Sequence, residues 1–325
     1  MPMQKSLVSL GFALSVTACA QSTTHDVSDV QPVRSDTYCA AGEYQAPKGT
    51  LEATRIEAAN FSAPGLYEGP VWVGDKLLFS RFGFGAGFPS NVLSYDGQEV
   101  AVVLADAGTN GLAIDNANQL IAGTHKYKAV ARFNLKDGQR QELASQYQGQ
   151  AFNSPNDLTM SARGDIYFTD PDFQRAAAPG GQDSTRVYRV DAQGQVSVVD
   201  DTIANPNGIS LSPDEQTLYV AGGGENGFVR AYPLDNGEAG SGQTLLADVT
   251  VPDGMAIDCL GNIYITEHTK QRVRVVTPEG DEIAVIHVDA NITNGAFGGE
   301  NGKTLYLTGA GALWSIELDV AGLPY

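Results

Sequence analysis

The chain has 325 residues, 42% of them hydrophobic and 18% charged, and its 38 acidic residues outnumber 20 basic ones for a formal net charge of −18. This composition is typical of a soluble globular protein, and such an acidic chain lacks the basic surface that nucleic acid or anionic lipid requires. The 37 glycines favour an all-β fold with many tight turns.

Residues 1–18 are predicted to be a signal peptide of the lipoprotein type. Lys5 supplies a weak positive region, and residues 7–16 form an apolar run that is too short to span a bilayer as a helix. Val16-Thr17-Ala18-Cys19 resembles a bacterial lipobox, in which the cysteine becomes lipidated; the alternative is ordinary signal cleavage close by. Either way we expect an exported protein, periplasmic or anchored to the outer membrane, with membrane contact only through that lipid.

Residues 19–45 are predicted to be a tether, because they are polar, aperiodic and poor in core-forming side chains. If Cys19 carries a lipid, Cys39 and Cys259 remain as an even pair in an oxidising compartment. They could form a disulfide that pins the N-terminal segment to the body. Alternatively, Cys259 is simply a small buried hydrophobic residue on a strand.

Residues 46–325 are predicted to form one all-β domain, a six-bladed β-propeller, because one pattern recurs along the chain. In each copy a polar residue, usually followed by glycine, leads into an apolar segment, a turn and a second strand. The copies lie 41 to 51 residues apart, which matches one four-stranded blade. They begin at Glu68, Asn110, Asn156, Asn207, Asp253 and Asn294.

The ring must also close, because an open ring would leave sheet edges unpaired. Residues 51–58 are strand-like and precede the first copy, and residues 313–318 end the last one. We expect the earlier segment to pair in the final blade.

The six leading polar residues are expected to converge on the propeller axis, since every inner strand begins at the same face of the tunnel. Two carboxylates and four carboxamides would form an all-oxygen cage, which suits a hard cation. A single Asn-Gly is usually only a turn, but six polar residues in register favour a central metal site. We expect one divalent ion, most readily Ca²⁺, with Zn²⁺, Mn²⁺, Mg²⁺ or Fe²⁺ as alternatives.

These motifs resemble those of the gluconolactonase / senescence-marker-protein (regucalcin-like) family of six-bladed β-propeller hydrolases. The similar segments are residues 68–72, 154–158, 167–171, 205–209 and 252–255. The resemblance implies that the metal is coordinated by Glu68, Asn156, Asn207 and Asp253. It places Asn110 and Asn294 as tunnel-lining residues.

The reaction that this resemblance implies is the opening of a sugar-derived lactone. A metal would polarise the carbonyl, and a carboxylate beside it would take a proton from the attacking water. Asp253 is favoured for that role, with Glu68 as the second catalytic residue. Asp157 directly follows a ligand, so we expect it to point away from the axis and to orient its neighbours. Asp170, at a strand end, is expected to be structural.

Four residues are predicted to contact the substrate: Asn110, His125, Arg81 and His268. The two histidines end inner strand pairs whose loops cover one face, although each could equally have a structural role. Arg81 opens residues 81–88 (Arg-Phe-Gly-Phe-Gly-Ala-Gly-Phe), where the family usually has an acidic residue and a short polar turn. We expect this aromatic loop to set substrate choice; alternatively, it only packs onto neighbouring blades.

Other functions fit the same residues. One alternative is a phosphotriesterase- or arylesterase-like hydrolase that uses the same cage, and another is a non-catalytic binding propeller whose metal stiffens the tunnel. The chain has neither a Gly-x-Ser-x-Gly nor a His-Glu-x-x-His motif, which argues against a serine hydrolase or a zincin. For the enzyme hypotheses, the partner is a small-molecule lactone or ester.

Overall fold

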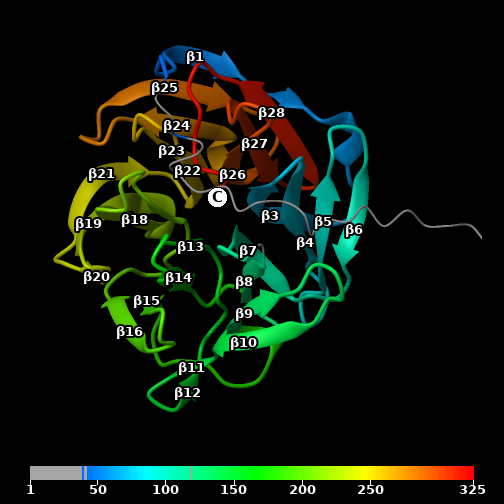
Figure 1. Cartoon of the computed structure of the whole chain (residues 1–325), viewed down its shortest axis with the longest axis vertical. Helices are drawn as coiled ribbons and strands as arrows, with labels where there is room; N and C mark the ends of the chain where they lie inside the picture. The colour runs from blue at the N-terminus through cyan, green and yellow to red at the C-terminus, as the bar shows by residue number, and fades with distance from the viewer. Residues whose placement is uncertain (1–38, 40–41, 118) are drawn as a thin grey trace, which may run out of the picture.

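The computed structural model describes residue 39, residues 42–117 and residues 119–325. Six small, mainly antiparallel sheets stand around a central axis, and each runs from an inner strand at the axis to outer strands at the rim (Figure 1). This arrangement confirms the predicted all-β, six-bladed propeller. The predicted signal peptide, and the tether up to residue 38, lie outside the described residues.

The first three blades are regular four-stranded sheets that follow one another along the chain. Blade 1 consists of β3 (Gly65–Val73), β4 (Lys76–Gly83), β5 (Ser90–Tyr95) and β6 (Val100–Leu104). Blade 2 consists of β7 (Thr109–Ile114), β8 (Leu120–Thr124), β9 (Ala129–Phe133) and β10 (Arg140–Ala144). A short ribbon then follows, β11 (Gln146–Tyr147) with β12 (Gln150–Ala151). Blade 3 consists of β13 (Leu158–Met160), β14 (Ile166–Asp170), β15 (Arg186–Val190) and β16 (Val196–Asp200).

Blades 4 and 5 each have five strands, and blade 6 has four, the outermost of which comes from the N-terminal segment. Blade 4 consists of β17 (Ile209–Leu211), β18 (Thr217–Gly222), β19 (Gly227–Asp235), β20 (Glu238–Ala239) and β21 (Gln243–Val249). Blade 5 consists of β22 (Pro252–Ile257), β23 (Ile263–Glu267), β24 (Arg272–Val276), β25 (Glu282–His287) and β1 (Gly49–Glu52). Blade 6 consists of β26 (Ile292–Gly298), β27 (Thr304–Gly309), β28 (Ala312–Glu317) and β2 (Thr54–Arg55).

The N-terminal strands close the ring. β2 pairs antiparallel with β28 and supplies the outermost strand of the final blade, as predicted from the sequence. The other half of the predicted segment behaves differently, because β1 pairs parallel with β25 and adds a fifth strand to blade 5. The N-terminal segment therefore joins two neighbouring blades instead of one.

Turns between strands are fixed by local side-chain bonds and by glycine. In the β5–β6 turn, Asp96 Oδ1 accepts hydrogen bonds from the backbone N–H groups of Gln98 and Glu99 at 3.0 and 2.9 Å. Gly97 in the same turn has φ +93°, a conformation that L-residues rarely adopt. Helical structure in the described residues is limited to single 3₁₀ turns: η1 (Glu57–Ala59), η2 (Arg175–Ala177), η3 (Gly224–Asn226) and η4 (His268–Lys270). None of the described segments is a helix long and apolar enough to cross a membrane.

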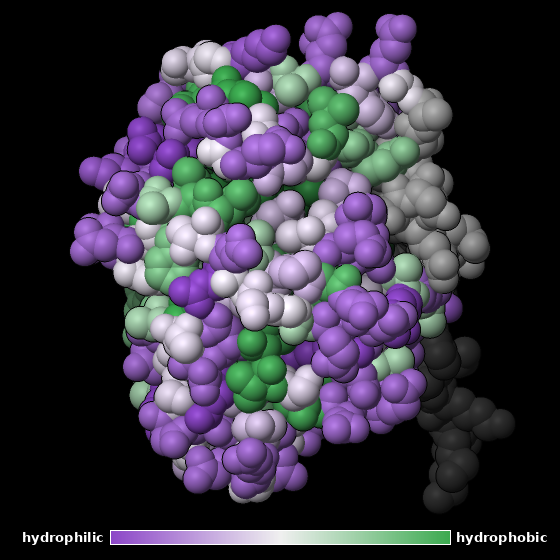
Figure 2. Space-filling view, turned by 90° about the vertical axis from the view of Figure 1, so that its left-hand side faces the viewer, coloured by the Kyte–Doolittle hydropathy of each residue, from purple (hydrophilic) through white to green (hydrophobic). Residues whose placement is uncertain are grey.

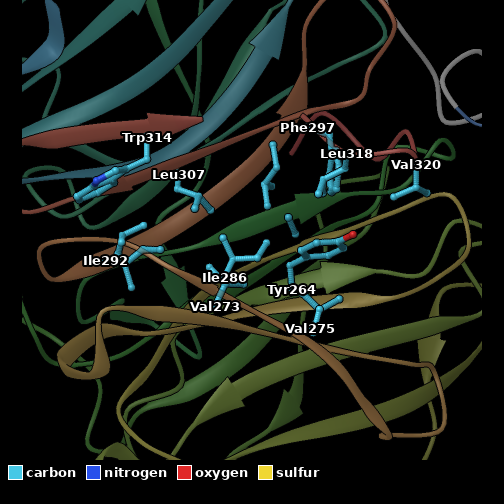
Figure 3. Packing of buried hydrophobic residues seen from close by; sticks show 14 of the residues in the cluster. Tyr264, Val273, Val275, Ile286, Ile292, Phe297, Leu307, Trp314, Leu318 and Val320 are labelled. Atoms are coloured by element: carbon cyan, nitrogen blue, oxygen red, sulfur yellow. The ribbon is translucent and has the colours of Figure 1, made fainter. Parts of the chain in front are cut away.

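The hydrophobic core lies between neighbouring blades. Figure 3 shows the layer between blades 5 and 6, where Tyr264 and Ile286 of one sheet pack against Phe297 and Trp314 of the other. Trp314 and Phe297 are fully buried. The outer surface is different: on the side of the ring shown in Figure 2, hydrophilic residues predominate and hydrophobic ones form small separate patches. The blades are thus held by apolar contacts with their neighbours around the whole ring.

The C-terminal residues cross the end of the tunnel that lies away from the axial polar residues. Leu323 N–H donates to the carbonyl of Ile257 at 2.9 Å, and Trp72 N–H donates to the carbonyl of Pro324, also at 2.9 Å. Tyr325 hydroxyl bonds the Met160 carbonyl at 3.2 Å. These contacts join blades 5, 1 and 3 at the far ends of their inner strands, and Figure 1 places the C-terminus near the ring centre. Access to the axial residues is therefore from the opposite end, which we call the mouth.

Cys39 and Cys259 form a disulfide, with their Cα atoms 5.1 Å apart. This resolves the two alternatives that the sequence left open. Cys259 lies just beyond the end of β22, whereas Asp253 lies near its beginning. The disulfide therefore fastens the N-terminal segment at the end of the propeller opposite the mouth.

Candidate functional site

The axial polar residues occur where the inner strands depart from regular pairing. In blades 1, 2, 5 and 6, the inner strand has one more residue than its neighbour at this point, so that Glu68 pairs with Ser80 but Val71 with Leu78. In blades 3 and 4, the inner strand begins only after the polar residue, at Leu158 and Ile209. A β-bulge bends a strand and re-aims its side chains. This irregularity lets residues at strand entry face the tunnel.

Glycine after the axial residue allows the inner strands to approach each other. A Cβ on Gly69 would lie 2.4 Å from Cα of Gly111, and a Cβ on Gly111 would lie 2.6 Å from the carbonyl oxygen of Asn156. Gly111 N–H also donates to that carbonyl at 2.8 Å. A side chain at these positions would force the blades apart. The glycines of these pairs therefore allow the inner strands to pack closely at the axis, whether or not they also form turns.

Three carboxyl groups share this buried region: Glu68, Asp157 and Asp253. Each is at least nine-tenths buried, with exposed fractions of 5, 6 and 8%. Burial raises the pKa of Glu68 well above its usual range, and the nearby charges of Asp253 and Asp157 raise it further. Burial also raises the pKa of Asp157 to about 7 and that of Asp253 above its ordinary value. The axis is thus a place where negative charge accumulates with little water to screen it.

Asp253 is held by two side chains from neighbouring segments. His268 Nδ1 lies 3.3 Å from Asp253 Oδ2, and Asn207 hydrogen-bonds the same carboxylate. His268 Nδ1 also lies 2.8 Å from the carbonyl of Ile292, and Asn291 Nδ2 lies 3.3 Å from Nε2. Burial lowers the pKa of His268, but the hydrogen bond and charge of Asp253 outweigh it, so the pKa is raised. The proton on Nδ1 therefore orients the Asp253 carboxylate.

Asp157 lies on the axis, which contradicts the prediction that it points away. Its Oδ2 accepts a hydrogen bond from Asn294 Nδ2 at 3.1 Å. These residues belong to blades 3 and 6, which are opposite in the ring, so the bond spans the tunnel. The prediction assumed strand alternation, but β13 starts only at Leu158 and the backbone before it is irregular. Asn294 lines the tunnel, in agreement with its predicted place.

Asn110 and His125 are buried in blade 2, and both have polar atoms without a partner among the described residues. Asn110 is 1% exposed, and neither its Oδ1 nor its Nδ2 is hydrogen-bonded. His125 Nε2 lies 2.8 Å from the Phe88 carbonyl, whereas its Nδ1 has no partner. Burial lowers the pKa of His125 to about 4, so the imidazole is neutral near pH 7. Unpaired buried polar groups are uncommon away from functional sites.

A model of the SMP-30/Gluconolactonase/LRE-like region matches residues 66–311. The chain belongs to this family. The match confirms the family resemblance predicted from the motifs. The gluconolactonase of Zymomonas mobilis is 27% identical over 276 residues, which cover 74% of this chain and 75% of that protein.

Solved structures agree with this family membership. A gluconolactonase from Xanthomonas campestris superposes with a TM-score of 0.71 at 28% identity, covering 85% of this chain and 99% of that one. A calcium-binding protein, regucalcin from Agrobacterium tumefaciens, superposes with a TM-score of 0.70 at 20% identity, covering 86% and 100%. The second comparison supports the fold alone.

The segments that deliver the axial residues of this SMP-30/gluconolactonase-family chain are anchored by buried acids at strand ends. Asp170 accepts hydrogen bonds from the backbone N–H groups of Asn153 and Ser154, both at 2.8 Å, just before Asn156. Burial raises its pKa to about 7, against the effect of these bonds. In blade 5, Glu267 accepts from Thr250 N–H at 2.7 Å, just before Asp253. The geometry of Asp170 is that of a structural residue, as expected.

Arg81 is directed away from the axial residues. Its guanidinium lies 4.4 Å from the ring centroid of Phe61, beside a surface pocket of about 470 Å³ on blade 1. Residues 81–83 belong to β4, since Phe82 pairs with Ser90, so the loop that was expected over residues 81–88 spans only residues 84–89. Phe84 is 59% exposed, whereas Phe82 is 2% exposed and faces His125 at a centroid distance of 5.9 Å. The segment thus combines packing residues with one exposed ring.

The described residues contain no group of three or more His, Cys, Asp or Glu side chains placed to hold a metal ion. An ion at the axis would therefore depend on amide oxygens together with Glu68 and Asp253. Asn156 is buried, Asn207 is half-buried, and the Asn110 amide is unpaired. This all-oxygen donor set, with concentrated buried negative charge, fits a hard divalent cation.

Proposed function

We propose that this protein is a metal-dependent lactonase that opens a sugar-derived lactone at the mouth of its axial tunnel. The observation that carries the proposal is the convergence of Glu68 and Asp253 with amide side chains in one buried region. A propeller alone would not support an activity, because this fold serves many functions. Membership of a family that includes the Zymomonas mobilis gluconolactonase supports the choice of a lactone as substrate.

We further propose that Glu68, Asn156, Asn207 and Asp253 hold one divalent cation, Ca²⁺ in the first instance. Buried carboxylates that repel each other are costly without a compensating positive charge. Burial raises the pKa of Glu68, and the charges of Asp253 and Asp157 raise it further, which reflects this cost. The donor set of two carboxylates and two amide oxygens favours a hard cation such as Ca²⁺. Such an ion would supply Lewis-acid polarisation of the lactone carbonyl.

In this proposal Asp253 acts as the general base. Its carboxylate would accept a proton from the water that attacks the lactone carbonyl. His268 keeps that carboxylate in place through its Nδ1 proton, because the same nitrogen is fixed by the Ile292 carbonyl. Cleavage of the ring C–O bond yields a hydroxy acid, which releases a proton near pH 7.

Asn110 is proposed to contact the substrate, since its amide has both a donor and an acceptor to offer. His268 would form one wall of the pocket beside Asp253. Arg81 lies against Phe61, so we place it at the outer rim, where it would meet only an extended substrate. The planar guanidinium of Arg81 would there bind a carboxylate or hydroxyl group of the substrate.

The proposal is tested with variants that remove one axial charge and keep the shape. Glu68→Gln and Asp253→Asn should each lower the rate of proton release from an aldonolactone by about 10²-fold or more, because a general base contributes 10² to 10⁴. The β-sheet circular dichroism should be unchanged. Glu279→Gln, in the exposed turn after β24, is the control and should keep full activity.

The same assay should include an aryl ester and a phosphotriester. Faster turnover of either than of every lactone would replace the lactonase proposal with one of those activities. Full lactonase activity in the Glu68 or Asp253 variant would show that the axial carboxylates are not the catalytic groups. If no substrate reacts but a cation still raises the melting temperature, the protein is a binding propeller.

A further inference from the structure

His125 presents a fixed hydrogen-bond acceptor that the protein itself does not use. The side chain is fully buried, with an exposed fraction of 0%. Its Nε2 lies 2.8 Å from the carbonyl oxygen of Phe88, and its Nδ1 has no hydrogen-bond partner among the described residues. A carbonyl can only accept, so Nε2 must carry the hydrogen.

The remaining nitrogen of His125 is therefore a lone-pair acceptor. Burial in apolar surroundings lowers the pKa of the imidazole to about 4, which keeps the ring neutral at neutral pH and leaves Nδ1 unprotonated. The rings of Phe82 and Phe88 lie 5.9 and 6.2 Å from the imidazole and restrict its rotation. The acceptor is thus rigid, neutral and desolvated, which are the properties of a recognition group for a neutral donor.

Strand register places His125 next to the axial site on the side of the mouth. It directly follows β8, whose last residue Thr124 pairs with Thr109, the neighbour of Asn110. Phe82, which contacts His125, lies two residues along β4 from Ser80, and Ser80 pairs with Glu68. Two residues of a strand span about 7 Å. Along the tunnel axis, His125 therefore lies about 7 Å nearer the mouth than Glu68.

We propose that His125 Nδ1 accepts a hydrogen bond from a hydroxyl group of the substrate, so that the site selects lactones with a ring hydroxyl over esters without a donor. This inference rests on the proposed lactonase function and assigns one residue to the recognition of its substrate. A donor-free lactone would leave the buried acceptor unpaired, which is unfavourable. We expect the preference from this one bond to be about 10- to 100-fold.

The first test compares two lactones with the same six-membered ring. D-Glucono-δ-lactone carries hydroxyl groups, and δ-valerolactone carries none. In His125→Phe, which keeps the ring volume, kcat/KM should fall about 10- to 100-fold for the first lactone and stay nearly constant for the second. His125→Gln, which retains a donor and an acceptor, should recover part of the loss. An equal loss on both lactones would overturn the inference.

The second test does not depend on turnover. Nitrogen-15 NMR of the native protein should report His125 with hydrogen on Nε2 and a bare Nδ1, and the Nδ1 signal should move when a gluconolactam, a non-hydrolysed polyol analogue, is added. His287, partly exposed on β25, is the internal control and should not respond. Hydrolysis of gluconolactone without any change at His125 Nδ1 would contradict this inference and leave the proposed function intact. If neither lactone is opened, the proposed function fails, and the lactam shift alone decides whether His125 binds a hydroxyl donor.

Discussion

At five of the six entries to the tunnel, the axial polar residue and the glycine that follows it have different roles. The polar residue supplies an oxygen to the axis, and the glycine lets the neighbouring inner strand come close enough to complete the cage. The strongest case is Gly254, where an added Cβ would lie 1.9 Å from Cγ of Asn294. In the proposed metal site, the distances between the ligands therefore depend on these glycines, although the glycines do not bind the metal themselves.

Replacement of Gly111 tests this dependence. Gly111→Ala would place Cβ 2.6 Å from the Asn156 carbonyl oxygen and 2.7 Å from Asp157 Cα, so backbone of blade 3 would have to move. We expect a loss of about 1–3 kcal/mol in the free energy of unfolding, the usual cost of overpacking, together with weaker metal binding. Urea unfolding and cation titration measure the two effects.

Gly85→Ala is the matched control, because its nearest atom, Pro89 Cδ, lies 3.8 Å from the added Cβ. This surface substitution should change stability by no more than about 0.5 kcal/mol. Equal effects of the two substitutions would mean that close packing of inner strands is not what the glycines provide.

The sequence was a better guide to which residues lie near the axis than to which side chains contact one another there. Six polar residues in register were sufficient to find them, because each repeat places the same position at the same radius. The Asp253–His268 contact was not predicted, since the residues come from a strand start and from the 3₁₀ turn after the next strand. Asp157 was misjudged, although one signal was present: it replaces the glycine found at this position in the other five copies.

At the scale of elements, strands were predictable and their ends were not. The strands β15 (Arg186–Val190) and β24 (Arg272–Val276) lie where the sequence alternates polar residues with β-branched or aromatic ones, a pattern that predicts a strand. The bulges at the inner strands have no such signal, since they arise from contacts with the adjacent blade. β4 extends to Gly83, into a segment that its glycines suggested was a loop, because Gly83 pairs with Gly65 of β3 in the same blade.

Hydroxyl groups on second strands lock neighbouring blades at the level of the site. Ser80 Oγ donates to the Asn110 carbonyl at 2.6 Å, and Thr169 Oγ1 donates to the Asn207 carbonyl at 2.7 Å. Each bond runs from one blade to the inner strand of the next. These elements therefore fix the axial residues through their backbones, which leaves the side chains free to serve a ligand.

At the scale of the whole molecule, the disulfide constrains a long stretch of chain. Cys39 and Cys259 are 220 residues apart, and closing so large a loop lowers the entropy of the unfolded chain by an amount worth about 5 kcal/mol. Disulfides persist in oxidising compartments. The disulfide is compatible with export, which stays a prediction from the sequence.

A lipid on Cys19 remains our prediction for the anchor, and the fold indicates where its tether would join the propeller. The disulfide lies at the end of β22 opposite Asp253, so a tether from Cys19 would join the propeller at the end away from the mouth. Mass spectrometry should find a diacylated N-terminal cysteine in the membrane fraction, and Cys19→Ser should release active protein into the soluble fraction. An unmodified N-terminus on soluble native protein would contradict the anchor.

The central claim, a metal-dependent lactonase at the propeller axis, is tested most directly by one measurement on the unaltered protein. Proton release from D-glucono-δ-lactone is followed before chelation, after exhaustive chelation, and after addition of Ca²⁺. A metal-dependent lactonase should show catalysed ring opening that falls to the uncatalysed rate on chelation and returns with the cation, since Glu68 and Asp253 cannot act together at a buried axis without it. Undiminished catalysis by protein shown to be free of metal would contradict it.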